Sequence, residues 1–496
     1  MLIGATLFVS AFTAIAEPFI NTSDLHLKAS LQQLSAAGHL NIPLTTYPLM
    51  WNDVNRALSI IAQSDLSDNA KKAYFHVKGE FKKATKKNIT LSANTASKDM
   101  RFTSFGDSFR QKNNLTLEIS NVYSTFAFKL SPSMTTSPIE GNHYQFNDSY
   151  IAAKWGNWNV SLGTQDRWWG PGWDTNMGLT NNARPMPTLS FTRNTSEPVT
   201  IPFTDYQIPW NVTTFIGQME EDRHIPNTLL WGFRLNFIPL ENLEVSLIRL
   251  AQWSGDGRNA DLSTFWDILQ GKDNCGATGS NNVDCGENDE DEPGNQSAGI
   301  DSRYSFSLFS QPIGIYGQYL GEDGSAKSGQ FISKPMIQFG ADTHFLAFEY
   351  SVSTFVEYSD TFRQCGNVDG IGNCIYEHHI YKTGMRYKKR SLGNLYDNDA
   401  HSYVFGFIGQ NHQGIEWDVK LRYVELNQDN SDRYPSDEKG NTLTEIAEDM
   451  TMVSTNFKQT FGKFSYKVGL SYSNSSYINL PDNSESNVYL ELRRRL

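Results

Sequence analysis

Apolar and polar residues alternate with a period of two from about residue 89 to the C terminus. The alternation is clearest in 415–423 and 464–472, where apolar side chains occupy every second position. Successive side chains of a β-strand point to opposite faces, so each stretch predicts a strand with one apolar and one polar face. The stretches run for about nine to thirteen residues, whereas soluble sandwiches typically use strands of about five or six and a tilted transmembrane strand needs about nine to eleven. The pattern therefore favours an all-β transmembrane barrel of antiparallel strands.

The expected connections between these strands differ in length. Short turns at one end of a barrel and long loops at the other are typical of outer-membrane barrels, whose long loops face the outside of the cell. We count about 17 strands; because a bacterial single-chain barrel has an even number, about 18 in all, we predict that one strand lies undetected between 359 and 401. The predicted short turns are 156–157, 239–242, 311–312 and 461–463, and the predicted long connections are 131–147, 166–211, 253–300, 323–334 and 428–449.

Composition excludes two other classes of protein. The mean hydropathy is −0.47, and no apolar run of about 20 residues follows residue 16, which excludes a helical membrane protein. The net charge of −12 gives the chain no general attraction for a phosphate backbone, so we predict no nucleic-acid partner. The aromatic share of 13% is high for so polar a chain, and the interfacial girdles of a barrel account for it.

The N-terminal part of the chain lacks the period of two. An apolar stretch ends in Ala-Ile-Ala before Glu17, as a signal peptide does. Apolar residues spaced three and four apart predict helices over 22–38, 52–63 and 67–85. We therefore divide the chain into a signal peptide at 1–16, an N-terminal helical bundle at 17–88 and a barrel at 89–496.

The third predicted helix has a basic face. We interpret this face as a solvated surface, and the alternative is docking onto an acidic surface of the same chain or onto anionic lipid. Its lysines are Lys71, Lys72, Lys78, Lys82, Lys83, Lys86 and Lys87, against the single acidic residue Glu80.

The four cysteines fall into two neighbouring pairs. Cys275 and Cys285 lie in one segment rich in Gly, Asn and Asp, and Cys365 and Cys374 lie in another. Pairing of neighbours predicts two short disulfide loops in an oxidising compartment. Zinc binding with the histidine pair at 378–379 is the alternative, which the missing C-x-x-C spacing disfavours. We predict no metal site and no cofactor.

An acidic run follows the second cysteine. Glu287, Asp289, Glu290, Asp291 and Glu292 are typical of a solvated loop, and they lack the spacing of a calcium-binding EF-hand. A calcium ion that bridges this run to an acidic polymer is the alternative.

The segment Arg-Trp-Trp-Gly-Pro-Gly-Trp at 167–173 is the strongest candidate for a binding site. Trp rings offer flat apolar faces to sugars, and arginine offers a planar fork to uronate carboxylates or ring hydroxyls. Gly-Pro-Gly predicts a tight turn from which the rings project. In the alternative interpretation the tryptophans pack inside the barrel as a constriction or plug, with the arginine paired to an acid of the lumen. The predicted polysaccharide-binding residues are Arg167, Trp168, Trp169, Trp173, Arg184 and Arg193. For the last two, a lumen salt bridge is the default interpretation and sugar contact is the alternative.

The sequence lacks the common catalytic motifs that would support an enzymatic function. The sequence has no G-x-S-x-G, no H-E-x-x-H and no phosphate-cradling glycine loop. Gly106-Asp107-Ser108 resembles a lipase fragment, but no D-x-x-H partner follows it. Spacing alone does not exclude paired carboxylates for glycoside hydrolysis. We predict that the protein is not an enzyme.

Two segments are distinctive as local sequences. SDLHLKASLQQLSAAGHLNIPLTTYPLMW occupies 23–51, and QDRWWGPGWDTNMGLTNNARPMPTLSFTR occupies 165–193. Together they resemble the capsule assembly Wzi family of Gram-negative outer-membrane proteins. The resemblance implies an 18-stranded barrel closed on the periplasmic side by a small helical bundle, a lectin that holds capsular polysaccharide and has no enzymatic role. The chain departs from the usual barrel pattern because it ends in Arg-Arg-Arg-Leu at 493–496 instead of an aromatic residue.

These observations predict an outer-membrane protein of a Gram-negative bacterium. We expect it to bind capsular polysaccharide at the cell surface and to assist its attachment and assembly. The expected partners are this polysaccharide, outer-membrane lipid and lipopolysaccharide, and we expect a monomer. The alternatives are a channel for small solutes or oligosaccharides, and an outer-membrane glycosidase or deacylase.

Overall fold

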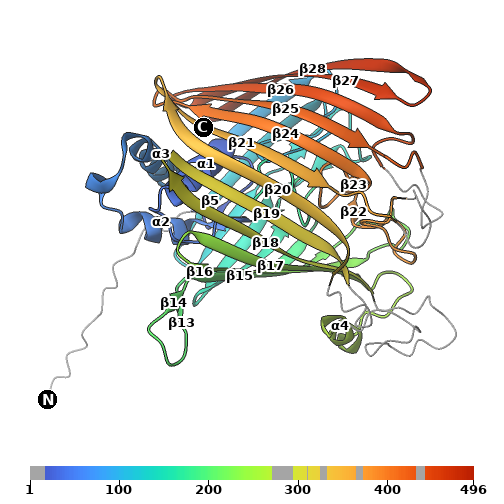
Figure 1. Ribbon diagram of the computed structural model, residues 1–496, viewed down its shortest axis with the longest axis horizontal. Coiled ribbons are helices and arrows are strands. Elements are labelled where there is room, and N and C mark those ends of the chain that lie inside the picture. The colour runs from blue at the N-terminus through green and yellow to red at the C-terminus, as the bar shows by residue number, and fades with distance from the viewer. Residues whose placement is uncertain (1–16, 271–293, 310, 324–331, 365–371, 432–441) are drawn as a thin grey trace.

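The computed structural model describes residues 17–270, 294–309, 311–323, 332–364, 372–431 and 442–496. Within these residues the chain forms one closed antiparallel sheet, the wall of a barrel (Figure 1). Its segments are β4 Asn88–Ala96, β5 Asn113–Val122, β6 Phe126–Leu130, β7 Ser133–Met134, β8 Tyr144–Gln145, β9 Ser149–Trp155, β10 Trp158–Thr164, β12 Thr188–Arg193, β15 Trp210–Gln218, β16 Leu229–Leu240, β17 Leu243–Trp253, β18 Gly294–Leu308, β19 Gln311–Asp323, β20 Ile332–Ala347, β21 Tyr350–Asp360, β24 Ala400–Gln410, β25 Ile415–Leu426, β26 Glu448–Phe461, β27 Phe464–Tyr477 and β28 Leu480–Arg495. Because β6 with β7 and β8 with β9 are interrupted strands, the described wall has 18 strands.

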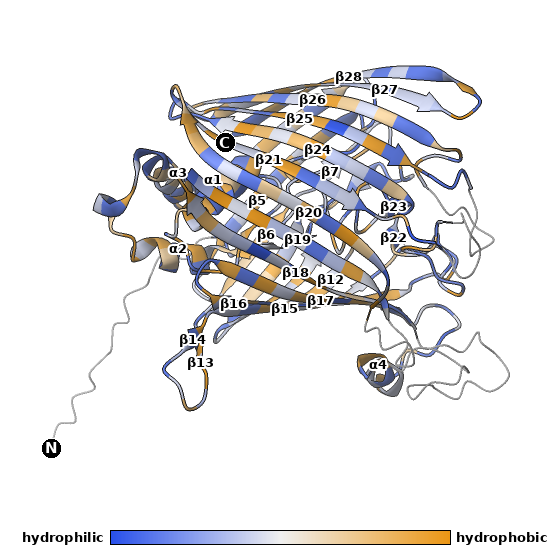
Figure 2. Cartoon of the chain, in the orientation of Figure 1, coloured by the Kyte–Doolittle hydropathy of each residue, from blue (hydrophilic) through white to orange (hydrophobic). Residues whose placement is uncertain are grey.

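The wall closes where its last strand, β28, pairs with its first, β4. Hydrophilic and hydrophobic residues are mixed along the strands of the wall (Figure 2). Successive residues of a strand point to opposite faces, so the two kinds of residue can be sorted to the two sides of the wall. In β25, Leu421 and Tyr423 are exposed on the outside, whereas Lys420 and Arg422 are buried and line a cavity inside. An apolar outer face and a polar lumen are typical of transmembrane barrels. The predicted all-β barrel is confirmed.

The prediction that a strand was missing between 359 and 401 is wrong. The described residues of that connection contain only a small hairpin, β22 Arg386–Tyr387 with β23 Arg390–Ser391, while β21 and β24 are direct neighbours in the wall. The undetected strand is β12, inside the stretch predicted as one loop at 166–211. Six residues between Pro187 and the next loop are too few for a clear alternation, so the strand escaped detection.

The barrel has two different ends. Short turns, the three N-terminal helices and the C terminus share one end, which we call the helix end; the opposite end is the loop end (Figure 1). The connection 165–187 leaves β10 at the loop end, and 194–209, which carries the hairpin β13 Val199–Thr200 and β14 Gln207–Ile208, lies at the helix end. The predicted loop 166–211 is thus two connections on opposite sides of the wall.

Three helices precede the barrel at the helix end. They are α1 Leu25–Ala36, α2 Trp51–Ser59 and α3 Asp68–Ala84, with a short 3-10 turn at Gln63–Asp65. The same part of the chain has three short strands: β1 Phe19–Ile20 pairs with β3 Leu49–Met50, and β2 Thr46–Tyr47 pairs with a strand of a later connection. In α1, 11 of 12 residues are buried, so protein surrounds the helix on all sides. The Asp24 side chain begins this helix by accepting from the Leu27 N–H. Whether residues 17–88 form an independent domain on the periplasmic side stays a prediction.

A fourth helix, α4 Leu262–Leu269, follows β17 at the loop end. Phe265 contacts Trp231 and Trp253 on the outer side of the wall. The guanidinium of Arg249 donates to the carbonyl oxygens of Ile268 and Leu269, which satisfies the C-terminal end of the helix.

Several predictions fall outside the described residues. These are the signal peptide at 1–16, the cysteines Cys275, Cys285 and Cys365, and the acidic run at 287–292. Cys374 is buried and disulfide-bonded, and both predicted pairings stay predictions. Among the helices of the described chain, none combines the length and the apolarity that a membrane span requires.

Deletion of residues 17–84 should leave a barrel that folds and inserts. The backbone groups of the wall are satisfied by the closed ladder itself, which does not use these residues. The expected result is a heat-modifiable band in SDS gels together with a higher conductance in planar bilayers, because α1 no longer occupies the lumen. The full-length mature chain is the control, and loss of the heat-modifiable band would show that the helices are required for assembly.

Candidate functional site

The connection 165–187 folds back into the lumen and meets the N-terminal segment there. Its strand β11, Trp168–Trp169, pairs with β2, so residues from the loop end and the helix end share one small sheet. The turn that follows requires glycine: a Cβ at Gly172 would overlap the carbonyl oxygen of Thr175, and Gly170 has a φ of +148°. We call residues 165–187 the plug loop.

The three tryptophans of the plug loop are completely enclosed. Trp168, Trp169 and Trp173 are at most 1% exposed. The indole N–H of Trp173 donates to Asp342 at 2.9 Å, and its ring stacks on Phe355. A buried indole with a satisfied N–H is a packing residue. This favours the alternative interpretation, in which the rings pack as a plug inside the barrel.

A lysine from α1 occupies the centre of this aromatic cluster. The Lys28 Nζ atom lies 4.4 Å from the ring centroid of Phe105 and 5.0 Å from those of Trp168 and Trp173. It donates to the carbonyl oxygen of Gly172 at 2.5 Å. Burial lowers the pKa of Lys28 well below its ordinary value, and the nearby ring faces favour its charged form. Lys28 is not among the site residues predicted from the sequence. The available signal is that a lysine lies between the apolar residues of the first helix.

Asp174 attaches the plug loop to the wall. It is fully buried, and its carboxylate accepts from Arg422 at 2.7 Å and from the hydroxyl of Tyr396 at 2.6 Å. The pKa of Asp174 is held well below its usual range: burial opposes this shift, but the charges of Arg422 and Lys420 outweigh it. The loop is therefore fixed to β25 by paired charges.

The predicted arginines do not form one site. Arg167 donates to the hydroxyls of Thr188 and Ser190, so its expected lumen acid is replaced by two hydroxyl groups. Burial lowers the pKa of Arg167 to about 10. Arg184 pairs with Glu140, as the lumen salt-bridge alternative predicts.

Arg193 lies at the other end of β12. Its guanidinium is 3.9 Å from the ring centroid of Trp210 and donates to two backbone carbonyls near the helix end. Arg184 precedes β12 and Arg193 ends it, so the two arginines lie at opposite ends of this strand.

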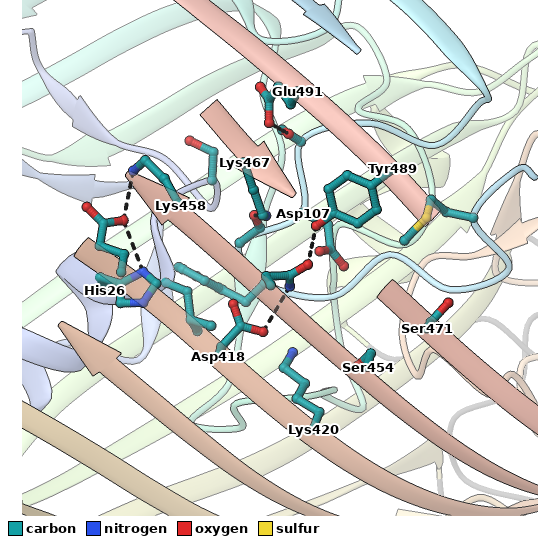
Figure 3. Close-up of a pocket in the computed structure, with 18 of the residues that line it drawn as sticks. His26, Asp107, Asp418, Lys420, Ser454, Lys458, Lys467, Ser471, Tyr489 and Glu491 are labelled. Atoms are coloured by element: carbon teal, nitrogen blue, oxygen red, sulfur yellow. Dashed lines mark hydrogen bonds and ion pairs between the residues drawn. The ribbon is translucent and has the colours of Figure 1, made fainter. Parts of the chain in front are cut away.

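A polar cavity remains between α1, the segment 97–112 and the inner faces of β25 to β28 (Figure 3). Its volume of about 80 Å³ has room for a few water molecules but not for a polymer. Lys458, Lys467 and Asp418 project into it, and the Ser108 hydroxyl donates to Glu491. Ser108 of the lipase-like fragment thus has a carboxylate partner rather than a histidine.

Asp24, His26 and Glu416 form the one group in the described chain whose spacing could hold a metal ion. The ring nitrogens of His26 already face Glu416 at 3.3 Å and the carbonyl oxygen of Trp417 at 3.2 Å. Lys458 also donates to Glu416 at 2.8 Å. With its ligand atoms engaged and an ammonium beside it, this group is better described as an ion-pair cluster.

An open cleft lies at the loop end. The hairpin of β22 and β23 turns at Lys388 and Lys389, both with positive φ. Lys389 is exposed and separates two hollows, of about 760 and about 330 Å³, which also share Thr442 and Leu443. Further lining residues are Arg101, Glu140, Asn182, Glu220, Asp222, Arg223, His224, Lys382 and Arg390.

The hairpin is connected to the plug loop beneath it. Arg390 donates to the side chain of Asn182, and Thr180 donates through its backbone to Leu392 and through its hydroxyl to Gly393. The plug loop therefore supports the floor of the cleft. The sequence offered one indication of this surface, the basic run at 388–390, which lay in a connection predicted to hold a strand.

Comparison with known proteins identifies similar chains. Residues 82–489 match the family model of the capsule assembly protein Wzi. An uncharacterized 55.8 kDa protein in the cps region of Klebsiella pneumoniae is 28% identical over 343 residues, which cover 68% of this chain and 64% of that relative. The chain thus aligns with less than two thirds of that relative's length.

A solved structure has the same fold. It is that of Wzi from Escherichia coli, described as an outer-membrane protein involved in group 1 capsule assembly and a carbohydrate-binding β-barrel. The TM-score is 0.79 at 23% identity, and the alignment covers 96% of this chain and 98% of that one.

The substitution Trp173→Ala should destabilise the plug loop. Removing a buried Trp side chain costs about 3–5 kcal/mol, and here Asp342 also loses a donor. Urea unfolding in detergent should show this loss, while Trp266→Ala on α4, where the ring is 61% exposed, should change the free energy of unfolding by about 0.5 kcal/mol or less. An unchanged stability with weakened polysaccharide binding would indicate that the Trp173 ring contacts the polymer instead.

Asp174→Asn should remove a pH-dependent part of the stability. A carboxylate with a lowered pKa stabilises the folded state above its unfolded pKa of about 3.9, and this contribution is lost as the pH falls towards the folded value. The variant should be less stable than the parent by about 3–5 kcal/mol at pH 7, since Arg422 and Lys420 lose their partner. The difference should shrink between pH 4 and pH 2, and a constant difference would contradict the assignment.

Proposed function

Since the chain belongs to the capsule assembly Wzi family, we propose that it is a non-enzymatic outer-membrane protein that binds capsular polysaccharide and assists its attachment at the cell surface. In the orientation usual for such barrels, the long connections of the loop end face the outside and the helix end faces the periplasm. The partner polymer would then meet the cleft around the β22–β23 hairpin.

One observation carries this proposal: the barrel offers an open cleft outside and a filled lumen inside. The cleft is supported from below by the plug loop and has the exposed Lys389 between its two hollows. Hollows of about 300–1,000 Å³ suit a few sugar units. Single sugar contacts are shallow and wet, so binding along a repeating polymer would depend on multivalency.

The six predicted binding residues take a different place in this proposal. The enclosed rings of Trp168, Trp169 and Trp173 would hold the plug loop in shape, with Arg167 and Arg184 beside them. Polymer contact would come from the hairpin, which lies at the surface. Arg193 lies near the helix end and would not meet the polymer.

The filled lumen also bears on the channel alternative. α1 and the plug loop meet inside the barrel, and the cavity between them and the wall admits little more than water. This supports a surface-binding role over a role as a solute channel. A full-length protein with porin-like conductance would contradict the proposal.

Lys388→Gln with Lys389→Gln should weaken binding to immobilised capsular polysaccharide of the source bacterium. We expect at least a threefold loss at low salt and a smaller loss at about 0.5 M salt, because exposed charges are screened. Surface plasmon resonance on the full-length protein measures this, and Lys86→Gln with Lys87→Gln at the helix end is the control of equal charge change. Equal binding by both variants would place the polymer elsewhere.

A further inference from the structure

Basic side chains gather on the rim of the helix end. They come from three separate parts of the chain: the end of α3 with the link to β4, the turn between β26 and β27, and the C terminus. We define this basic rim by Lys82, Lys86, Lys87, Lys463, Arg494 and Arg495.

Backbone contacts bring these parts together. The N–H of Leu496 donates to the carbonyl oxygen of Ile89 at 2.8 Å, two residues after Lys87. The N–H of Arg495 donates to the carbonyl oxygen of Lys463, also at 2.8 Å. The C terminus therefore lies between the turn and the α3–β4 link, and Figure 1 places it at the end of the barrel that carries the helices.

The cations of the basic rim have no acidic partners among the described residues. Nearby acids are engaged elsewhere: Glu80 pairs with Lys83, and Glu491 pairs with Arg493. Five of the six side chains are exposed, and only Arg495 is half-buried. Three lysines of the predicted basic face, Lys82, Lys86 and Lys87, therefore pair with no acidic residue of the described chain. Another lysine of that face, Lys72, donates to the backbone carbonyl oxygen of Glu349 in a turn of the wall at 2.8 Å.

Helix capping explains only a small part of the arrangement. Lys82 lies in the last turn of α3, where a cation interacts favourably with the helix dipole. Lys86 and Lys87 follow the helix, and the remaining three cations belong to strands or turns. The helix dipole therefore does not explain why these five positions are basic.

The basic rim continues the lipid-facing surface of the barrel. Arg494 pairs with Phe464 across β27 and β28, on the face that also presents Leu492 and Val468 to the outside. Its guanidinium lies 5.1 Å from the ring centroid of Phe464, which is 55% exposed. An aromatic ring at the edge of the apolar belt, with a cation just beyond it, is the arrangement expected at the depth of lipid headgroups.

We propose that the basic rim binds the phosphate headgroups of anionic phospholipids in the membrane leaflet next to the helix end. The exposed cations supply charge complementarity, and the adjacent apolar belt of exposed side chains would face the acyl chains of the same lipids. Basic residues beside a membrane surface attract anionic lipid with an effect that falls off within a Debye length. The proposal concerns the opposite end from the polysaccharide cleft and does not depend on it.

The test uses the full-length mature protein in mixed micelles with equal amounts of phosphatidylglycerol and phosphatidylcholine. Native mass spectrometry then gives the ratio of the two lipids bound. The parent should retain phosphatidylglycerol at least threefold over phosphatidylcholine, and Lys86→Gln, Lys87→Gln and Arg494→Gln combined should bring the ratio close to one. Lys388→Gln with Lys389→Gln, at the loop end, should keep the parent ratio.

Three outcomes would overturn the proposal: no preference in the parent, an unchanged preference in the rim variant, or an equal loss in the loop-end variant. A heat-modifiable band confirms that each variant is folded before its lipids are measured. If the triple variant does not fold, Lys86→Gln with Lys87→Gln alone, in a link outside helix and strand, should lower the ratio at least twofold, and an unchanged ratio would again contradict the proposal.

Discussion

Closure of the backbone hydrogen-bond ladder is the constraint on which the rest of the structure depends. In a bilayer no water can satisfy an open strand edge, so a sheet survives there only as a closed wall. Here the last strand meets the first through the pairing of β28 with β4. The backbone groups of the wall are therefore hydrogen-bonded without help from the connections. The connections between the strands can then form binding surfaces.

A wall of 18 strands encloses more space than its own inward side chains can fill. The chain fills this space with segments from both ends: α1 from one side and the plug loop from the other. Arg234 with Asp301 and Arg303 with Asp342 lie fully buried among them, each pair bonded at 2.6 Å. Such pairs cost desolvation and contribute little net stability, but breaking one is expensive. Both pairs join strands of the wall. Because Arg234 also donates to Thr45 and Asp342 also accepts from Trp173, they help to hold the N-terminal segment and the plug loop in one arrangement.

The strands could be predicted because a transmembrane wall imposes a period of two over its whole length. β25 and β27 are long enough to show that period clearly, whereas the six residues of β12 are not. The helices were also predictable, since α1 and α3 begin with the capping residues Asp24 and Ser67 and all three helices carry spaced apolar side chains. Local pattern is sufficient for elements of this kind.

The candidate site was harder to predict because its geometry depends on contacts between distant segments. The Trp-Trp-Gly-Pro-Gly-Trp sequence is the same whether its rings face solvent or the lumen, and only the pairing of β11 with β2 decides between the two. Lys28 and Gly172 are 144 positions apart in the chain. No local pattern shows that these two residues meet. For this reason, neither the aromatic cluster around Lys28 nor the surface cleft above the plug loop could be predicted from the sequence.

Net charge is a poor guide to what such a chain binds. The whole chain carries −12, yet cations lie together at the half-buried Lys388 and the exposed Lys389 on one end and at the basic rim on the other. Screening limits each charge to about 8–10 Å under physiological salt, so a ligand responds to the nearest cluster and not to the total. The two ends can therefore engage different anionic partners, although the chain as a whole is acidic.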